Sequence, residues 1–363
     1  LFLGLGVGAG HACGLAFPSE LMKEHHWLIL GTKTMIDAGF VLAGFVPLVL
    51  YCIFGEQHLC LVCGLSLGFG AIPAFVVLWK IAIPFYHMLE QEKHVPDCNC
   101  EILLVGPKEV CILNWLSLKW CWKSVLGLSL AWFIYDFIMY VHFAIYSSMI
   151  TNNVTGGILS ISIVLGWTVL INLFRIPGTV LGTYLIDYLG VRATMVVGSF
   201  LQAILGLTIG MYTPLTNHIA AFAVVYGIFL TLGEVGPGSC LRVLAAKTGP
   251  SACISGQIYS VAGAIGKVGA LIGTWVFPQI IDAFGGSKTV KGSTGPFWIG
   301  SGVAILSVIV TFVLQKPLTL DGRKADNKAF HQYLEENGFV FIPASDVRAS
   351  AEEVMCIEVD KWQ

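Results

Sequence analysis

Residues 296–315 read PFWIGSGVAILSVIVTFVLQ, a run of twenty positions that contains no charged side chain. A helix needs about 20 mostly apolar residues to cross the hydrocarbon core of a bilayer, so this run predicts a transmembrane helix. Eight further runs have the same character, and together the nine predict an all-α polytopic membrane protein. The eight are 1–17, 28–54, 60–80, 124–148, 158–186, 193–212, 218–241 and 256–281.

The composition of the whole chain agrees with this prediction. Of its 363 residues, 56% are hydrophobic and 12% are charged, and the mean hydropathy is +0.79. A soluble domain has about a quarter of its residues charged, and a disordered chain combines low hydrophobicity with high net charge. The formal net charge of −2 provides no basic field for a polyanion. We therefore expect the lipid bilayer, and no nucleic acid, as a partner.

The distribution of Lys and Arg predicts the orientation, because short cytoplasmic loops of membrane proteins collect these residues. If the C-terminus is cytoplasmic and the nine runs alternate, 15 of the 20 basic residues fall on the inner side, including Arg242 and Lys247. Two fall on the outer side. The remaining three, Lys33, Arg175 and Lys267, lie within predicted spans. We predict a multi-pass protein with its C-terminus in the cytoplasm.

The eleven cysteines do not predict a disulfide framework or a metal site. Cys60 and Cys63 form a CxxC pattern without the strand–helix–strand context of a redox motif. The histidines and cysteines of 87–100 match no standard zinc-binding spacing. We expect most cysteines to be small buried hydrophobic residues, and we expect no metal and no cofactor.

Ionisable side chains inside membrane spans are costly, so each is a candidate functional residue. Asp136 lies near the middle of the run 124–148. Trp132 and Tyr140 lie four residues before and after it, so the three side chains share one helical face. A carboxylate between two aromatic rings is a plausible proton site. The alternative is a structural carboxylate bonded to a neighbouring helix.

Lys267 is a second candidate, in the segment Gly263-Ala-Ile-Gly266-Lys267-Val-Gly269. The flanking glycines permit close helix approach, and an ammonium group in a cavity suits an anionic substrate such as a phosphate. The alternative is a lysine that extends along its helix to reach the membrane surface.

Glu234 begins a third candidate segment, Glu234-Val-Gly236-Pro237-Gly238-Ser239. Pro237 removes a helical hydrogen-bond donor, and transporters place such broken helices at binding sites. The alternative is a packing kink without ligand contact. Three other charged residues within the predicted spans have simpler interpretations. Lys33 and Asp37 are four residues apart and can pair on one helical face, and Arg175 can reach Asp187 or the inner surface.

Six short patterns and one loop give the chain a resemblance to a known family. The loop Asp187-x-x-Gly190-x-Arg192 is similar to the signature of the major facilitator superfamily. Within it, the chain resembles the phosphate:proton symporter branch, and most of all fungal glycerophosphoinositol permeases. The patterns are Met35-Ile-Asp37-x-Gly39-Phe40, Trp132-Phe-Ile-Tyr-Asp136, Gly233-Glu234-x-Gly236-Pro237-Gly238, Ala264-Ile-Gly266-Lys267-x-Gly269-Ala270, Gly273-Thr-Trp275-x-Phe277-Pro278 and Gly295-Pro296-Phe297-Trp298-Ile299-Gly300.

The resemblance implies a major facilitator fold, in which twelve spans form two six-helix bundles. The nine runs then correspond to helices four to twelve, and the first three of the twelve helices are lacking. Residues 1–83 are expected to be the remnant of the N-terminal bundle, 84–122 a central cytoplasmic loop and 123–316 the C-terminal bundle. Residues 317–363 are expected to be a cytoplasmic tail.

The resemblance also implies a function, which is proton-coupled uptake of a glycerophosphodiester, such as glycerophosphoinositol, across the plasma membrane. The partners are then protons and a small anionic substrate that contains phosphate. Asp136 would carry the proton and Lys267 would hold the phosphate. Substrate contacts are also expected at Trp132, Tyr140, Glu234 and Ser239.

Two alternatives stay open, a symporter of inorganic phosphate and a truncated remnant that does not transport. Relatives carry an acidic residue in helix four where this chain reads Gly8-Ala-Gly10-His11-Ala12. With this departure and three helices lacking, we expect the 363-residue chain to insert into the membrane without transporting. An enzyme is disfavoured, because no nucleophile–base pair or metal motif lies at one membrane face.

Overall fold

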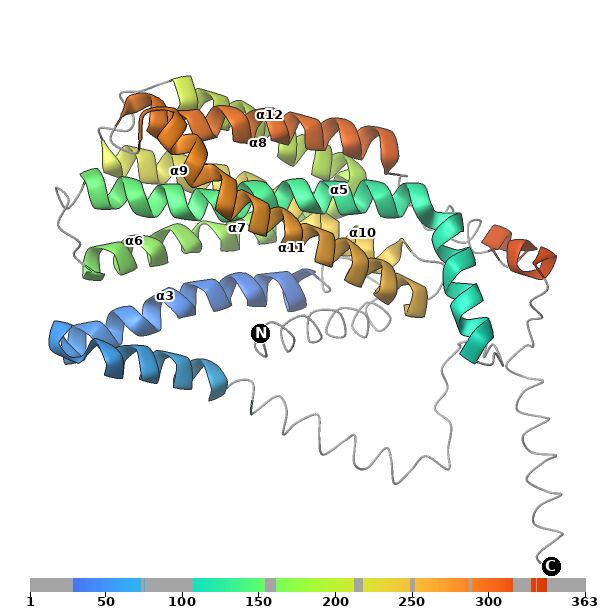
Figure 1. Cartoon of the computed structure of the whole chain (residues 1–363), viewed down its shortest axis with the longest axis horizontal. Helices are drawn as coiled ribbons and strands as arrows, with labels where there is room; N and C mark the ends of the chain where they lie inside the picture. The colour runs from blue at the N-terminus through green and yellow to red at the C-terminus, as the bar shows by residue number, and fades with distance from the viewer. Residues whose placement is uncertain are drawn as a thin grey trace, which may run out of the picture. The chain divides into compact units, whose positions relative to one another are not determined.

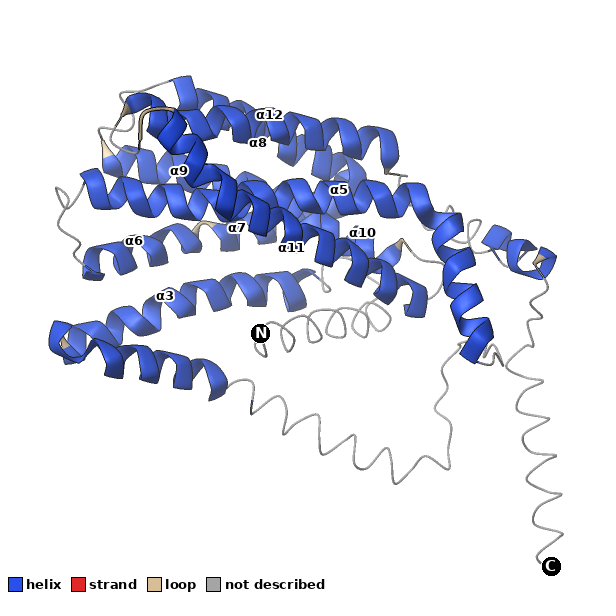
Figure 2. Ribbon diagram, in the orientation of Figure 1, coloured by secondary structure: helices blue, strands red, loops and turns tan. Residues whose placement is uncertain are grey.

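The computed structural model describes residues 29–72, 75, 107–153, 161–211, 218–248, 252–286, 289–315, 328–330 and 332–337, with side chains of α5 described over 115–139. Every regular element in these ranges is a helix, as Figure 2 shows. The run predicted at 1–17 lies outside the described residues.

Seven helices of the described chain are long and apolar enough to cross a membrane, which confirms seven of the nine predicted runs. The run predicted at 60–80 corresponds, as far as it is described, to a shorter apolar helix, Glu56–Ile72. The seven candidate spans are Leu30–Phe54, Trp115–Met139, Ile161–Leu189, Val191–Met211, Ala220–Lys247, Ser255–Ala283 and Val290–Leu314.

Two boundaries differ from the prediction. The stretch 84–122, expected to be a loop, is helical from Pro107 onward, because it continues into α5 (Pro107–Asn153). Proline is favoured in the first turn of a helix, where no partner exists for its missing N–H. The run predicted at 158–186 divides into α6 (Ile161–Leu173) and α7 (Arg175–Leu189). Pro177 explains this division, since it cannot donate to the carbonyl four residues earlier.

The chain forms two compact units, one of residues up to Phe69 together with Cys121–Leu320, the other of Gly70–Trp120 together with the segment from Asp321. In the first unit, α12 (Val290–Leu314) packs along α8 (Val191–Met211), and α3 (Met35–Phe54) packs against α6 (Figure 1). The core of this unit includes a group of buried rings. Phe222, Tyr226, Phe229 and Phe297 contact one another through stacked and edge-on pairs.

Between α9 (Ile219–Gly233) and α10 (Ser239–Lys247), the helix widens into a five-residue π-turn, η4 (Glu234–Gly238). The proline-containing segment predicted to break a helix is therefore a π-turn. Glycines allow α8 to approach this turn very closely. A Cβ atom at Gly198 would lie 2.6 Å from the backbone nitrogen of Gly236. Such contacts between small residues are a common way for membrane helices to pack.

In the second unit, the tail is helical over 328–330 and 332–336. Phe330 and Leu334 are four residues apart, so they share one apolar helical face, and both are buried. The ring of Trp120, at the end of the α5 segment in this unit, lies 6.1 Å from that of Phe330 and 5.0 Å from that of Tyr333. The apolar face therefore packs against a ring of α5.

The expectation for the cysteines is correct for Cys240, which is buried, and wrong for Cys52, Cys60 and Cys63, which are exposed. The physical reason is that lipid, like a protein core, is apolar. A small hydrophobic residue on a membrane helix is equally well placed on a face that contacts lipid. The cysteines and histidines of 87–100 lie outside the described residues.

Candidate functional site

Two groups of charged side chains meet at α5 in the first unit. Tyr135 donates a hydrogen bond to Glu234, with its oxygen 3.1 Å from Oε2. The next residue, Asp136, pairs instead with Lys267 of α11 (Ala252–Ala283). Successive residues of α5 thus contact different helices, and each contact leads to a separate charged group.

The first group is an ion pair between Asp136 and Lys267, two of the candidate functional residues identified from the sequence. The Nζ atom of Lys267 lies 3.0 Å from Oδ2 of Asp136. Asp136 is 3% exposed, whereas the side chain of Lys267 is 55% exposed. One partner is therefore held inside the protein, and the other remains accessible to an anion.

Glycines of α11 allow this pair to form. A Cβ atom at Gly266 would lie 2.5 Å from Cδ1 of Trp132, and one at Gly269 would overlap the carbonyl of Phe133. The expected close approach at these glycines is confirmed, and α5 is the helix approached. Trp132 is buried, with its ring edge-on to that of Tyr259 at 5.1 Å. Tyr140 lies in α5, and its side chain is outside the described part.

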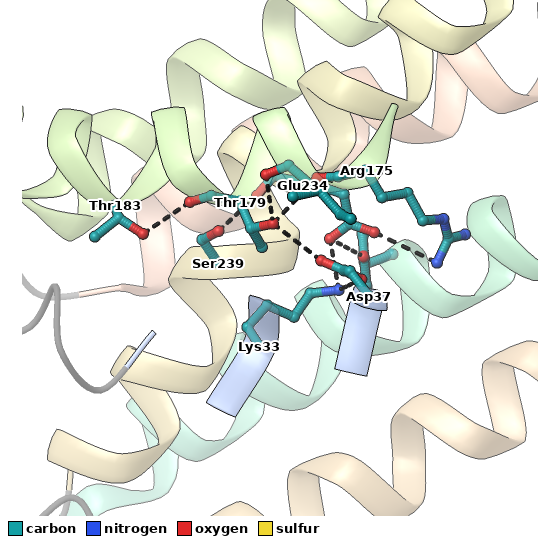
Figure 3. A network of polar contacts seen from close by, with 9 residues as sticks. Lys33, Asp37, Arg175, Thr179, Thr183, Glu234 and Ser239 are labelled. Carbon is teal, nitrogen blue, oxygen red and sulfur yellow. Dashed lines mark hydrogen bonds and ion pairs between the residues drawn. The ribbon is translucent and has the colours of Figure 1, made fainter. Parts of the chain in front are cut away.

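The second group is a buried network of two cations and two carboxylates (Figure 3). Nζ of Lys33 lies 2.7 Å from Oδ1 of Asp37 and 2.8 Å from Oε2 of Glu234. Nη1 of Arg175 lies 3.5 Å from Oε1 of Glu234. The side chains of the four residues are between 0% and 13% exposed. The charges balance, which buried ions require, because an unpaired charge in an apolar interior is very costly.

Hydroxyl groups complete the network. Thr179 of α7 donates to Oδ2 of Asp37 at 3.1 Å, and Thr183 donates to the carbonyl of Thr179 at 2.7 Å. Ser239 is fully buried and donates to the backbone carbonyl of Glu234 at 2.7 Å. Ser239, predicted to contact substrate, thus satisfies a carbonyl at the π-turn.

Of the two interpretations for buried charges, one is confirmed and one is wrong. The pairing of Lys33 with Asp37 is as predicted. Arg175, however, pairs with Glu234, and its guanidinium lies 5.1 Å from the ring centre of Phe40. Arg175 and Asp187 are twelve residues apart on α7, a rise of about 18 Å that an arginine side chain cannot span.

The charge count placed Arg242 and Lys247 in an inner loop, but both belong to α10. The candidate span continues from Ala220 to Lys247, so the helix extends beyond the predicted end at 241. Lys247 is 7% exposed and Arg242 is half-buried. Sequence reasoning had therefore missed Arg242 as a cation of the bundle interior.

The described geometry favours Lys267 as the anion-binding group. Its ammonium is accessible and sits beside a buried carboxylate, whereas the balanced network around Glu234 is closed to solvent. An exposed cation paired with a buried carboxylate on membrane-spanning helices is a candidate functional site of a membrane transporter.

Comparisons with known proteins agree with this conclusion. Residues 111–317 match the family of sugar (and other) transporters. A glycerophosphocholine permease of Candida albicans is 36% identical in an alignment of 344 positions that covers 93% of this chain and 62% of the permease. A glycerophosphodiester transporter of the same organism is 36% identical in an alignment of 368 positions that covers 99% of this chain and 65% of that protein.

A third relative is a major glycerophosphoinositol permease of Candida albicans, which is 33% identical in an alignment of 371 positions that covers 99% of this chain and 67% of the permease. Inorganic phosphate transporters are more distant relatives. The chain spans less than two thirds of the length of the first two relatives. It belongs to the sugar (and other) transporter family of the major facilitator superfamily, whose members are membrane transporters and not enzymes.

Proposed function

We propose that this protein takes up a glycerophosphodiester together with protons across the plasma membrane, with its C-terminus in the cytoplasm. The ion pair between Lys267 and Asp136 carries this proposal, because it combines an accessible cation with a buried, titratable carboxylate at 3.0 Å. The names of the three permease and transporter relatives support a glycerophosphodiester as the substrate class.

In the proposed mechanism, the substrate and the proton act on the same ion pair. An arriving phosphate group competes with Asp136 for the ammonium of Lys267. A proton that binds Asp136 removes the carboxylate charge, so Asp136 ceases to compete and Lys267 binds the phosphate more strongly. Loss of the proton on the opposite side restores the competition and expels the anion. Uptake is therefore driven by the proton gradient.

The proposal extends to the surroundings of the pair. Trp132 is buried against Tyr259, and together they form an aromatic wall beside Asp136. Tyr140, one helical turn further along α5, extends the same face. We propose that Glu234 and Ser239 act indirectly, by holding the π-turn and the hydroxyl of Tyr135 in place next to Asp136.

We also propose a correspondence with the twelve-helix fold. The helices Leu30–Phe54 and Glu56–Ile72 take the places of helices five and six, and the six spans from α5 to α12 take those of seven to twelve. On this assignment, the network around Glu234 joins the N-terminal bundle, through Lys33 and Asp37, to the C-terminal bundle.

The test is uptake of labelled substrates by yeast cells that lack their own diester transporters. Cells expressing this chain, with or without three N-terminal helices taken from a relative, receive labelled glycerophosphoinositol, glycerophosphocholine or inorganic phosphate. We expect the extended protein to accumulate diester in a manner abolished by a protonophore. Accumulation of phosphate but no diester would favour the phosphate symporter instead. Diester uptake that is indifferent to the proton gradient would contradict proton coupling.

A further inference from the structure

Arg242 has no assigned role, yet its position places it at the ion pair. Gly238, at the end of the π-turn, lies against α5, since a Cβ atom there would be 2.9 Å from the hydroxyl oxygen of Tyr135. Arg242 lies four residues later on α10, so it projects from the same helical face one turn further on. It therefore also faces α5, and α10 packs against α11, which carries Lys267.

The electrostatic contacts of Arg242 agree with this placement. Its charge acts on the carboxylate of Asp136 and on the hydroxyl of Tyr259. Lys267 acts on the same two groups. The carboxylate of Asp136, beside the paired rings of Trp132 and Tyr259, thus lies in the field of Lys267 and Arg242, and also of Lys33.

The guanidinium of Arg242 has unused hydrogen-bonding capacity. Within the described part of the chain, its Nη1 atom is buried and has no hydrogen-bond partner. A buried donor without a partner is rare in proteins, and its cost rises when the group is charged. Arg carries five N–H donors in a planar fork that matches the oxygens of a phosphate group. The missing partner is therefore expected to be an anion with paired oxygens.

The two cations suit the phosphate group of the proposed substrate. A phosphodiester has two non-ester oxygens that share one negative charge, so one oxygen can bind Lys267 while the other binds Arg242.

We propose that Arg242 is a second cationic ligand of the substrate, which binds one non-ester oxygen of a monoanionic phosphodiester while Lys267 binds the other. This inference rests on the proposed function and adds to it a second residue that binds the phosphate group. Because the guanidinium remains charged through the cycle, it retains the anion while the proton on Asp136 regulates the contribution of Lys267.

The experiment measures binding rather than uptake. Asp136 on α5, Arg242 on α10 and Lys267 on α11 are all present in the 363-residue chain, so their effect on binding can be measured without additional helices. The 363-residue protein is placed in lipid nanodiscs, and the dissociation constant of labelled glycerophosphoinositol is measured, with unlabelled inorganic phosphate as competitor. The variants are Arg242→Gln and Arg242→Lys. Lys291→Gln is the matched control, because it removes one positive charge from an exposed position at the start of α12. Lys267→Gln tests the proposed function independently.

We expect Arg242→Gln to weaken diester binding by about 10- to 100-fold, the effect of losing a charge-assisted hydrogen bond. Arg242→Lys keeps the charge without the fork, so it should weaken binding by a smaller, several-fold factor. Lys291→Gln should bind as the unsubstituted protein does.

Each other outcome has a definite meaning. Unchanged affinity in Arg242→Gln, with weakened binding in Lys267→Gln, overturns the role of Arg242 and leaves the proposed function standing. If the unsubstituted protein binds no diester, or if Lys267→Gln binds normally, the proposed function fails and this inference fails with it. If Arg242→Gln also lowers the melting temperature, the result for Arg242→Lys distinguishes the two roles. Weaker diester binding by Arg242→Lys at an unchanged melting temperature supports the ligand role, and unchanged diester binding by Arg242→Lys overturns it.

Discussion

Replacing Glu234 by Gln should destabilise the protein strongly, because it removes one charge from a closed and balanced network. The glutamine keeps the shape of the side chain and can still accept from Tyr135. It no longer balances Lys33, at 2.8 Å, and Arg175, at 3.5 Å. Lys33 retains Asp37 at 2.7 Å, so the uncompensated charge falls on Arg175, whose side chain is 13% exposed.

The magnitude follows from the burial of these groups. Breaking a buried ion pair by removing one partner costs about 3–5 kcal/mol of unfolding free energy. At roughly 2 °C per kcal/mol for a large domain, the melting temperature should fall by about 6–10 °C. The measurement is thermal unfolding of the protein in detergent, followed by the loss of monodisperse protein on size-exclusion chromatography.

The chain contains a matched control for this substitution. Glu56 also accepts a hydrogen bond from a tyrosine, Tyr51, at 2.8 Å, but on the exposed surface. Glu56→Gln should give no measurable shift. The double variant Lys33→Gln/Glu234→Gln removes one charge of each sign. Its loss of unfolding free energy should therefore be smaller, by about 1 kcal/mol or more, than the summed losses of the single variants Lys33→Gln and Glu234→Gln. Equal shifts for Glu234→Gln and Glu56→Gln, or strict additivity in the double variant, would refute the reasoning.

Three further predictions concern the same bundle. Gly198→Ala should lower the free energy of unfolding by about 1–3 kcal/mol, because the new methyl group meets the backbone of Gly236. Gly39→Ala has open space around it, so in the same denaturation assay it should be neutral or stabilising. Asp136→Asn should bind diester while its uptake, in the extended protein, no longer changes with external pH, since an amide cannot titrate. A pH profile like that of the unsubstituted protein would move the proton site elsewhere. Lys267→Gln should raise the dissociation constant for the diester by about 10- to 150-fold, because a charge-assisted contact worth about 1.5–3 kcal/mol of binding free energy is lost. Normal affinity in equilibrium binding would remove Lys267 from the phosphate site.

Local patterns in the sequence predicted the helices and the contacts within one helix. Apolar runs located seven candidate spans, and the four-residue spacing of Lys33 and Asp37 predicted their pairing. These features depend on neighbours along the chain, so hydropathy and helical periodicity are sufficient to identify them.

Contacts between helices could not be predicted in the same way. Asp136 and Lys267 were both identified as functional residues, but their contact spans 131 positions and was not foreseen. The partner of Arg175 was assigned wrongly for the same reason. Exposure was also difficult to predict for Cys60 and Cys63, since hydropathy does not distinguish a face that contacts lipid from one that contacts another helix.

The π-turn also absorbs a residue that a regular helix could not accommodate without rotating everything after it. An α-helix advances about 100° per residue, and a π-turn holds about one more residue per turn than an α-helix does. Deleting one residue from Glu234–Gly238 should therefore convert the turn to α-helical geometry and leave α10 nearly in phase. Deleting one residue within α10 would instead rotate the residues after it by about 100° and shift them by about 1.5 Å. The chain can thus change length by one residue at this turn while Arg242 keeps its direction, and no substitution scan examines this property.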